Sequence, residues 1–172
     1  MAASGLARIV LFLSSYSPLF VILGLRNSFG NEIVRYGMLA LAVLSVAFLV
    51  TFLSVARGIT GTRIRVDEAN SRDGEAMSYI VTYLLPFLDV SFNDAANALS
   101  LTVILLVIAV IYVHSNMIHV NPILSLMGYH VFEIRADSGK VSSYITRSKY
   151  IRPGTEILAS PIGDQVLVEK NQ

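Results

Sequence analysis

Three uncharged, apolar segments constrain this chain more than any other feature of its sequence. They cover residues 9–25, 36–56 and 95–113. An α-helix rises about 1.5 Å per residue, so about 20 residues cross the hydrocarbon core of a bilayer. The first segment is close to the lower limit of that length. Only 15% of the residues are charged, against roughly a quarter in soluble domains, so we expect most of the apolar surface to face lipid.

A fourth membrane-spanning segment is predicted from charge, because length alone does not support it. The uncharged stretch at residues 76–88 is too short to cross a bilayer, although Asp73 and Glu75 suit the first turn of a helix there. Without this crossing, the basic residues divide five against eight between the two sides of the membrane. With it, they divide eleven against two. Lys and Arg near helix ends are retained in the cytoplasm, so this asymmetry favours four crossings with both termini cytoplasmic.

The four predicted transmembrane helices cover residues 8–25, 35–56, 73–91 and 95–116. Two basic residues, Arg26 and Arg35, fall on the outer side. The eleven on the cytoplasmic side are Arg8, Arg57, Arg63, Arg65, Arg72, Arg135, Lys140, Arg147, Lys149, Arg152 and Lys170.

The first apolar segment is predicted to be a retained helix with a kink. No small-residue cleavage site follows Leu25, so the segment does not have the pattern of a signal peptide. Pro18 lies in its middle and Pro86 near the end of the third helix, and both are candidate helix kinks. Serines just before Pro18 can bond the backbone groups that a proline frees. A functional hinge is the alternative interpretation.

The character of the sequence changes after residue 129. Two alternating runs flank the turn at residues 136–140 and two more flank residues 160–164, so two β-hairpins are predicted. Residues 62–66 also alternate and can add a strand. We therefore predict a mainly α membrane protein: a four-helix transmembrane domain at residues 1–129 and a small cytoplasmic β module at residues 130–172. A module of this size holds no large core of its own, so we expect it to pack on the helix ends or on a neighbouring subunit.

No pattern typical of catalysis or cofactor binding is present. The chain has no cysteine, which excludes disulfides and thiolate chemistry. His114 and His119 are separated by roughly 140° on a helix, so they share no face for a metal ion. Asp89 and Asp94 bracket a short outer loop without a neighbouring nucleophile. We expect neither an enzyme nor a bound cofactor or metal; a membrane-embedded enzyme using the two histidines is the distant alternative.

Two groups of basic residues are candidate contacts for a partner protein or for anionic lipid. Positive charge beside a membrane attracts lipid headgroups, and the same charge can dock a cytoplasmic protein. Mixing of basic and aromatic residues, as around Tyr144 and Tyr150, can also bind nucleic acid. The first group is Arg57, Arg63, Arg65 and Arg72, and the second is Arg147, Lys149 and Arg152.

Two further stretches carry a family resemblance. Tyr79-Ile80-Val81-Thr82-Tyr83-Leu84-Leu85-Pro86 and Asn121-Pro122-Ile123-Leu124-Ser125-Leu126-Met127-Gly128-Tyr129 resemble the third helix and the segment after the fourth helix of the membrane subunits of the Kiwa anti-phage system. The resemblance covers roughly residues 79–134. It implies an oligomeric, multi-pass protein of the bacterial inner membrane that detects phage attack at the envelope. It also implies a cytoplasmic DNA-binding partner, so that nucleic acid is met only indirectly.

Two functions are therefore predicted. The first is a non-enzymatic inner-membrane sensor and scaffold that recruits or controls a cytoplasmic DNA-binding effector in anti-phage defence. Short outer loops favour it, because nothing on the outside is large enough to grip a soluble ligand. The alternative is a small oligomeric channel or membrane-permeabilising protein, which Pro18, Pro86 and Asp89 motivate.

Overall fold

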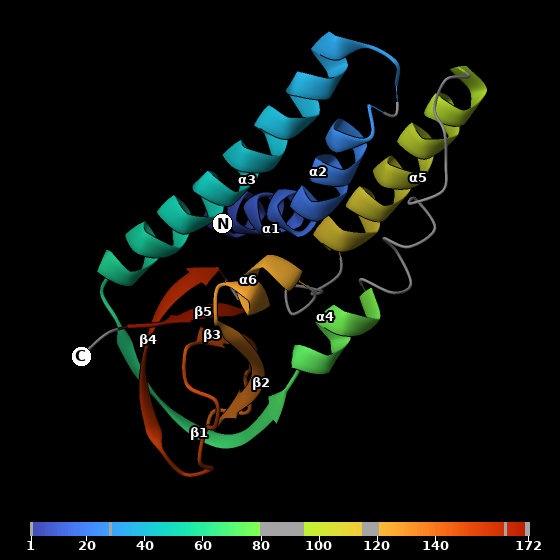
Figure 1. The fold of residues 1–172 in the computed structure, drawn as a ribbon. Helices are drawn as coiled ribbons and strands as arrows, with labels where there is room; N and C mark the ends of the chain where they lie inside the picture. Colours follow the sequence, from blue (N-terminus) through green and yellow to red (C-terminus); the bar gives the residue numbers. More distant parts are fainter. Residues whose placement is uncertain (1, 28, 80–94, 115–120, 164, 171–172) are drawn as a thin grey trace.

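The computed structural model describes residues 2–27, 29–79, 95–114, 121–163 and 165–170. Figure 1 shows a helical part at one end of the molecule and a barrel of β-strands at the other. The helix α1 (Ala2–Ser15) runs between the two parts.

The first apolar segment is divided into two helices. α1 ends at Ser15 and α2 (Ser17–Leu25) begins two residues later, with the buried Tyr16 between them. Pro18 lies in the first turn of α2, where its missing N–H removes no helical hydrogen bond. The hydroxyls of Ser14 and Ser15 both donate to the carbonyl of Leu11, at 2.9 and 2.7 Å, so they are satisfied inside the bend.

The helix α3 (Glu32–Gly58) packs closely against α2. Its N-terminus is capped by Asn31, whose side chain accepts from the N–H groups of Ile33 and Val34. A Cβ atom at Gly24 of α2 would lie 2.7 Å from the Leu39 side chain of α3. Only glycine permits this approach, and small residues are what closely packed apolar helices require.

The strands form a closed barrel in the order β1-β2-β3-β5-β4. They are β1 (Thr62–Ser71), β2 (His130–Ala136), β3 (Val141–Thr146), β4 (Glu156–Gly163) and β5 (Val166–Glu169). The first half of β1 pairs with β4 and its second half with β2. All pairs are antiparallel except β3 with β5. This strand order is that of the five-stranded Greek-key barrel called the OB-fold.

A long insertion separates the first two strands of the barrel. It contains α4 (Asp73–Tyr79), α5 (Ala95–His114) and the short α6 (Pro122–Leu126). The barrel is therefore discontinuous in sequence, and the insertion begins and ends at neighbouring strands.

Alternation along the strands produces two apolar clusters. Inside the barrel, side chains such as Phe132 and Ile134 of β2 form one cluster. Val131 of the same strand points outward, where it belongs to a second cluster shared with α1, α3 and α6. Successive strand residues face opposite sides, so one strand contributes to both cores and fixes the barrel against the helices.

A buried asparagine connects α1 and α6. The Asn121 side chain is 1% exposed. Its Nδ2 donates to the Leu11 carbonyl at 3.1 Å and to the Ser14 hydroxyl at 2.8 Å. Its Oδ1 accepts from the N–H of Ile123 at 3.0 Å, which caps α6. Every polar atom of this amide is therefore used in holding the bend of α1 against the start of α6.

The predicted fold class is wrong. Among the described residues, two helical segments, Ala7–Leu25 and Glu32–Gly58, are long and apolar enough to cross a membrane. The first of them is 56% buried and is bent. α2 by itself is about 13 Å long, which is less than half of a hydrocarbon core. A four-helix membrane protein is not what the chain forms.

The predicted β module is also corrected. It is a closed five-stranded barrel with its own interior core. The strand expected near residues 62–66 does join it, as the first part of β1. Of the predicted third helix at residues 73–91, the structure describes α4 alone, and residues 80–94 with Pro86, Asp89 and Asp94 lie outside the described residues. β1 and the later strands belong to one barrel. Their basic residues therefore lie together on one body, and this grouping is no evidence for a further membrane crossing.

We expect Asn121→Ala to lower the free energy of unfolding by about 2 to 4 kcal/mol, through loss of a helix cap and of two buried hydrogen bonds. Asn121→Asp keeps the capping oxygen but turns a second carboxylate oxygen toward the Leu11 carbonyl at a buried position, so it should destabilise the protein at least as much as Asn121→Ala. Thermal unfolding of the detergent-solubilised protein measures the change. Asn70→Ala, at an exposed position of β1, is the control, and an equal effect of both alanine variants would contradict the role of Asn121.

Candidate functional site

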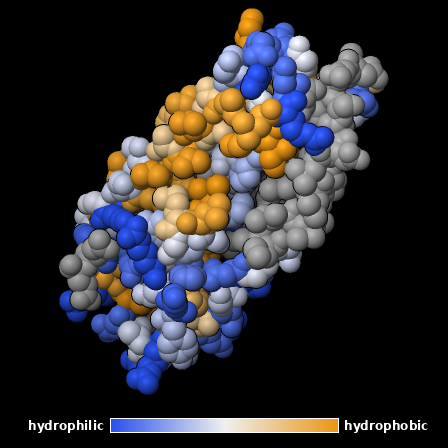
Figure 2. All heavy atoms as spheres, viewed as in Figure 1, coloured by the Kyte–Doolittle hydropathy of each residue, from blue (hydrophilic) through white to orange (hydrophobic). Residues whose placement is uncertain are grey.

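The outward face of α3 is apolar. Exposed side chains along it include Ile33 (83% exposed), Val43 (70%), Phe48 (65%) and Val55 (64%). Figure 2 shows these apolar residues as a band over the helical part, with hydrophilic residues at the far end of α3 and over the barrel. α5 exposes a comparable set of apolar side chains: Leu99, Val103, Ile104, Leu106, Val107 and Val110. Exposed apolar surface of this extent is typical of membrane or protein contacts.

Two described segments fit a membrane span by length and composition alone. Buried core helices and signal sequences meet the same criterion, and both segments lie near the N-terminus. Glu32–Gly58 differs from a core helix in one respect: only 22% of its most apolar stretch is buried inside the molecule.

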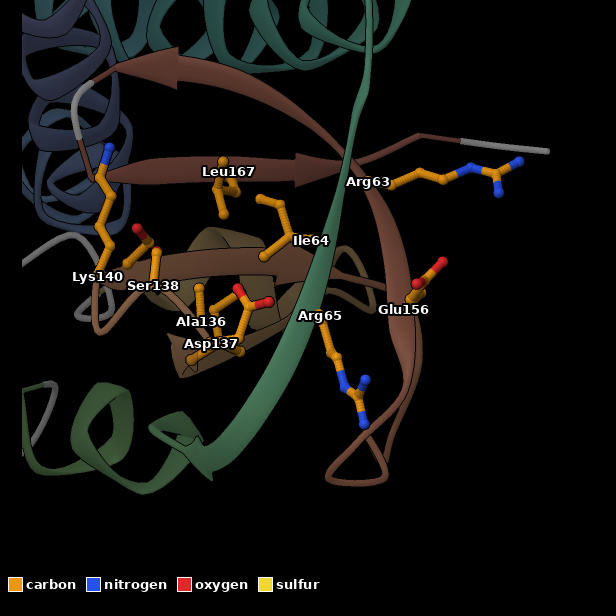
Figure 3. A pocket seen from close by; sticks show the side chains of 11 residues that line it. Arg63, Ile64, Arg65, Ala136, Asp137, Ser138, Lys140, Glu156 and Leu167 are labelled. Carbon is orange, nitrogen blue, oxygen red and sulfur yellow. The ribbon is translucent and has the colours of Figure 1, made fainter.

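Arg63 and Arg65 lie on the outer face of β1, with Ile64 and Val66 turned toward the barrel interior. The two arginines border a cavity of about 460 Å³ that Lys140, Asp137 and Glu156 also line. In Figure 3, Ile64 and Leu167 face its centre, and the Arg63 and Arg65 side chains extend away from it. The rim carries charges of both signs, and the described residues that line the cavity include no aromatic side chain of the kind on which bases stack.

Arg72 has a structural role at the junction of β1, α4 and β2. Its guanidinium contacts Glu75 at 2.7 Å and Glu133 at 3.0 Å. These bonds, Glu133 first and then Glu75, raise the pKa of Arg72. Next to it, Asp73 contacts Nδ1 of His130 at 2.7 Å and accepts from the N–H of Val131 at 3.1 Å. Arg72 is engaged within the molecule and is a poor candidate for a partner contact.

Arg57 and Arg147 meet at Tyr129, although sequence reasoning placed them in separate groups. Arg57 comes from the last turn of α3, and Arg147 follows β3. The carbon of each guanidinium lies 5.1 Å from the centroid of the Tyr129 ring. Arg57 Nη2 also donates to the Tyr129 hydroxyl at 2.5 Å. Tyr129 itself was missed as a site residue, because no local pattern links it to either arginine.

The other basic residues of the second group lie near the loop between β3 and β4. Arg152 lines a cavity of about 630 Å³ together with Tyr150 and Glu169. Lys149 is exposed beside it. Tyr150 is 72% exposed, but Tyr144 is 3% exposed and belongs to the barrel core. The aromatic and basic mixture seen in sequence therefore offers one accessible ring, not two.

Glu169 shapes this region through hydrogen bonds to β3 and the loop after it. Its carboxylate accepts from the hydroxyl of Thr146 and from the N–H of Arg147, both at 2.8 Å. Burial, and next the charge of Glu169, raise the pKa of Tyr144 to about 12.

No group of three or more His, Cys, Asp or Glu side chains gathers in the described part of the chain. His130 is paired with Asp73, and His119 lies outside the described residues. The side chain of His114 is also not described.

Comparison with known proteins identifies the family. The family model of the anti-phage protein KwaA matches residues 7–168. The chain belongs to the KwaA anti-phage family. The match covers both the helices and the barrel, so family membership applies to the whole arrangement and places the chain in anti-phage defence.

A curated relative agrees with this assignment. The Kiwa protein KwaA of Escherichia coli O55:H7 (strain RM12579 / EPEC) is 24% identical over 71 residues. The match spans 41% of this chain and 36% of that relative, so it covers well under two thirds of the relative's length. No solved structure matches the chain. The predicted resemblance to the Kiwa system is confirmed.

The barrel should lose stability in alkali because of Tyr144. Its pKa is raised in the folded state, so between about pH 10 and about pH 12 the unfolded chain releases a proton that the folded chain keeps. Folding free energy from this residue is present below pH 10 and declines through that interval. Unfolding measured against pH should show a shallower alkaline decline for Tyr144→Phe than for the wild type or for exposed Tyr150→Phe. Equal declines in all three proteins would exclude Tyr144 as the cause.

Proposed function

We propose that this chain acts in anti-phage defence as a non-enzymatic, membrane-associated sensor and scaffold that recruits or controls a cytoplasmic DNA-binding effector. The observation that carries the proposal is the family match over residues 7–168, combined with a barrel that bears basic residues beside an exposed apolar helical surface. The effector follows from the resemblance to the Kiwa system, to which the name of the curated relative also refers.

Association with the bacterial inner membrane is supported by α3. Its 27 residues extend about 40 Å, more than the thickness of a hydrocarbon core. Arg35 pairs with Glu32 near one end, and Arg57 lies in the last turn at the other. Arginine at the ends of an apolar helix reaches the headgroup layer. We place the barrel, and with it both chain termini, on the cytoplasmic side, because basic residues are retained there.

The outer face of β1 is the surface we propose for the effector. The helices cover the outer faces of β2, β3, β4 and β5 through residues such as Val131, Ile145 and Ile162. On β1, Arg63 and Arg65 point outward and are exposed. A surface that remains open in the described structure and carries charge suits a reversible contact with a soluble protein.

Assembly of several copies is a further part of the proposal. Gly37, Ala40 and Ala47 are exposed on α3, and a Cβ at Gly37 would have no neighbour within 4 Å among the described atoms. Small residues on an exposed apolar helix allow a second helix to approach closely.

The alternative of a channel or permeabilising protein has less support. Pro18 lies in the first turn of α2 and does not interrupt a continuous helix. Pro86 and Asp89 lie outside the described residues. Conductance of the purified protein in planar bilayers would favour this alternative over the sensor.

We expect Arg63→Glu combined with Arg65→Glu to lower effector recovery by about tenfold, because like charges facing each other at an interface cost several kcal/mol. Co-purification of the tagged chain from membranes of infected and uninfected cells measures recovery, and plaque counts measure protection. Arg26→Glu, exposed at the end of α2, makes the same kind of charge reversal once, at a site far along the helices from β1, and should leave recovery and protection unchanged. Recovery of the wild-type chain without any partner in both cell states, or only in the soluble fraction, would overturn the proposal.

A further inference from the structure

We propose that Arg57, Arg147 and Tyr129 form a binding site for the phosphate group of an anionic lipid headgroup. This inference rests on the membrane association proposed above and assigns a specific site to it. The three residues come from the end of α3, the residue after β3 and the segment between α6 and β2. They meet where the helical part joins the barrel.

The geometry places two positive charges at one ring. Each guanidinium carbon is 5.1 Å from the Tyr129 centroid, so the two cations are separated by no more than about 10 Å, a distance at which like charges still repel. The Tyr129 ring is buried, at 3% exposure, and offers both cations the same π system. An anion placed at this site would offset a repulsion that the ring alone does not remove.

Neither guanidinium has an acidic partner among the described residues. Arg35, Arg72 and Arg135 each lie within salt-bridge distance of a glutamate, but Arg57 and Arg147 pair with none in that part of the chain. Arg57 Nε is enclosed and has no hydrogen-bond acceptor among the described atoms. Glu169 lies near Arg147 but accepts its backbone N–H and the Thr146 hydroxyl, so it does not neutralise the guanidinium by a direct pair.

The available donors match a phosphate. Guanidinium groups bind phosphate oxygens through parallel N–H bonds, which a point charge such as lysine does not reproduce. The Tyr129 hydroxyl accepts from Arg57 and retains its own proton to donate. The site therefore supplies donors from three side chains and, from those same side chains, no negative charge.

The location favours a lipid as the source of that phosphate. Arg57 lies between Val55 and Ile59, which are 64% and 44% exposed at the barrel end of α3. Figure 2 shows the apolar band giving way to hydrophilic residues toward the barrel. In a membrane-associated protein this boundary lies at the level of the headgroups, where anionic lipids concentrate negative charge. Free inorganic phosphate has the same chemistry, but it gains nothing from the apolar surface beside the site.

The full chain, purified in detergent, tests this inference. Native mass spectrometry counts bound lipid and a thermal-unfolding midpoint reports stabilisation, with phosphatidylglycerol, phosphatidylcholine or inorganic phosphate added at equal concentration. We expect phosphatidylglycerol to bind and to raise the midpoint. Arg57→Gln with Arg147→Gln should weaken that binding by about tenfold or more, and Arg57→Lys with Arg147→Lys should weaken it less, since lysine keeps the charge but loses the fork.

The matched control is Arg135→Gln with Lys140→Gln, which removes two charges from the barrel elsewhere and should bind phosphatidylglycerol as the wild type does. Circular dichroism confirms that each variant is folded before it is compared. Equal binding by the wild type and the Arg57 and Arg147 variants would overturn the site. Equal stabilisation by inorganic phosphate would overturn the lipid as its source.

Failure of this inference is distinguishable from failure of the proposed function. If the chain remains in the membrane fraction but binds phosphatidylglycerol without Arg57 and Arg147, only the site is excluded. If the wild-type chain is recovered in the soluble fraction, the membrane association itself is excluded and the site with it.

Discussion

The pairing of β1 with both β4 and β2 is the constraint on which the rest of the structure depends. β1 closes the barrel from one side of the helical insertion, and β2 completes it from the other. The chain must therefore leave the barrel after Ser71 and return to it by His130. This closure brings Arg57, at the end of α3, to Tyr129, just before β2. It also turns Arg63 and Arg65 outward, on a strand face that the described helices leave open.

Much of the strand pattern could be predicted, because alternation of polar and apolar residues is a local signal. The hairpin of β2 and β3 turns at residues 137–140, and β1 begins at Thr62, where the sequence indicates a strand. Barrel closure could not be predicted, since pairing between residues so far apart in sequence leaves no local trace. The four-helix prediction failed because it explained the grouping of basic residues by a crossing. Barrel pairing groups β1 with the later strands directly, and the bend at Tyr16 divides the first apolar segment into pieces too short to match a straight span.

The candidate site shows the same division between local and distant information. Sequence reasoning selected basic residues by position beside apolar segments, and Arg57, Arg63, Arg65 and Arg147 are accessible or partly accessible in the structure. It could not separate them from Arg72, which is held by two glutamates, one of them on β2. Nor could it find Tyr129 or Asn121, whose roles depend on contacts with α3 and α1 across the fold. The sequence suggested that Tyr144 could contact a ligand. Successive residues of a strand face opposite sides, and Tyr144 faces the barrel core.

The discontinuous barrel makes folding of the strands dependent on completion of the helical part. During synthesis β1 emerges early and carries unpaired backbone groups until β2 and β4 follow. Pairings between distant segments form late, because the intervening chain must first be ordered. The barrel can close only when the helical segment between β1 and β2 has brought Ser71 and His130 together. In a chain that enters a membrane, these two residues must therefore lie on the same side of it. The outer face of β1 therefore exists in its final form only in molecules whose helical insertion has folded, so completion of the barrel reports on the folding of the whole chain.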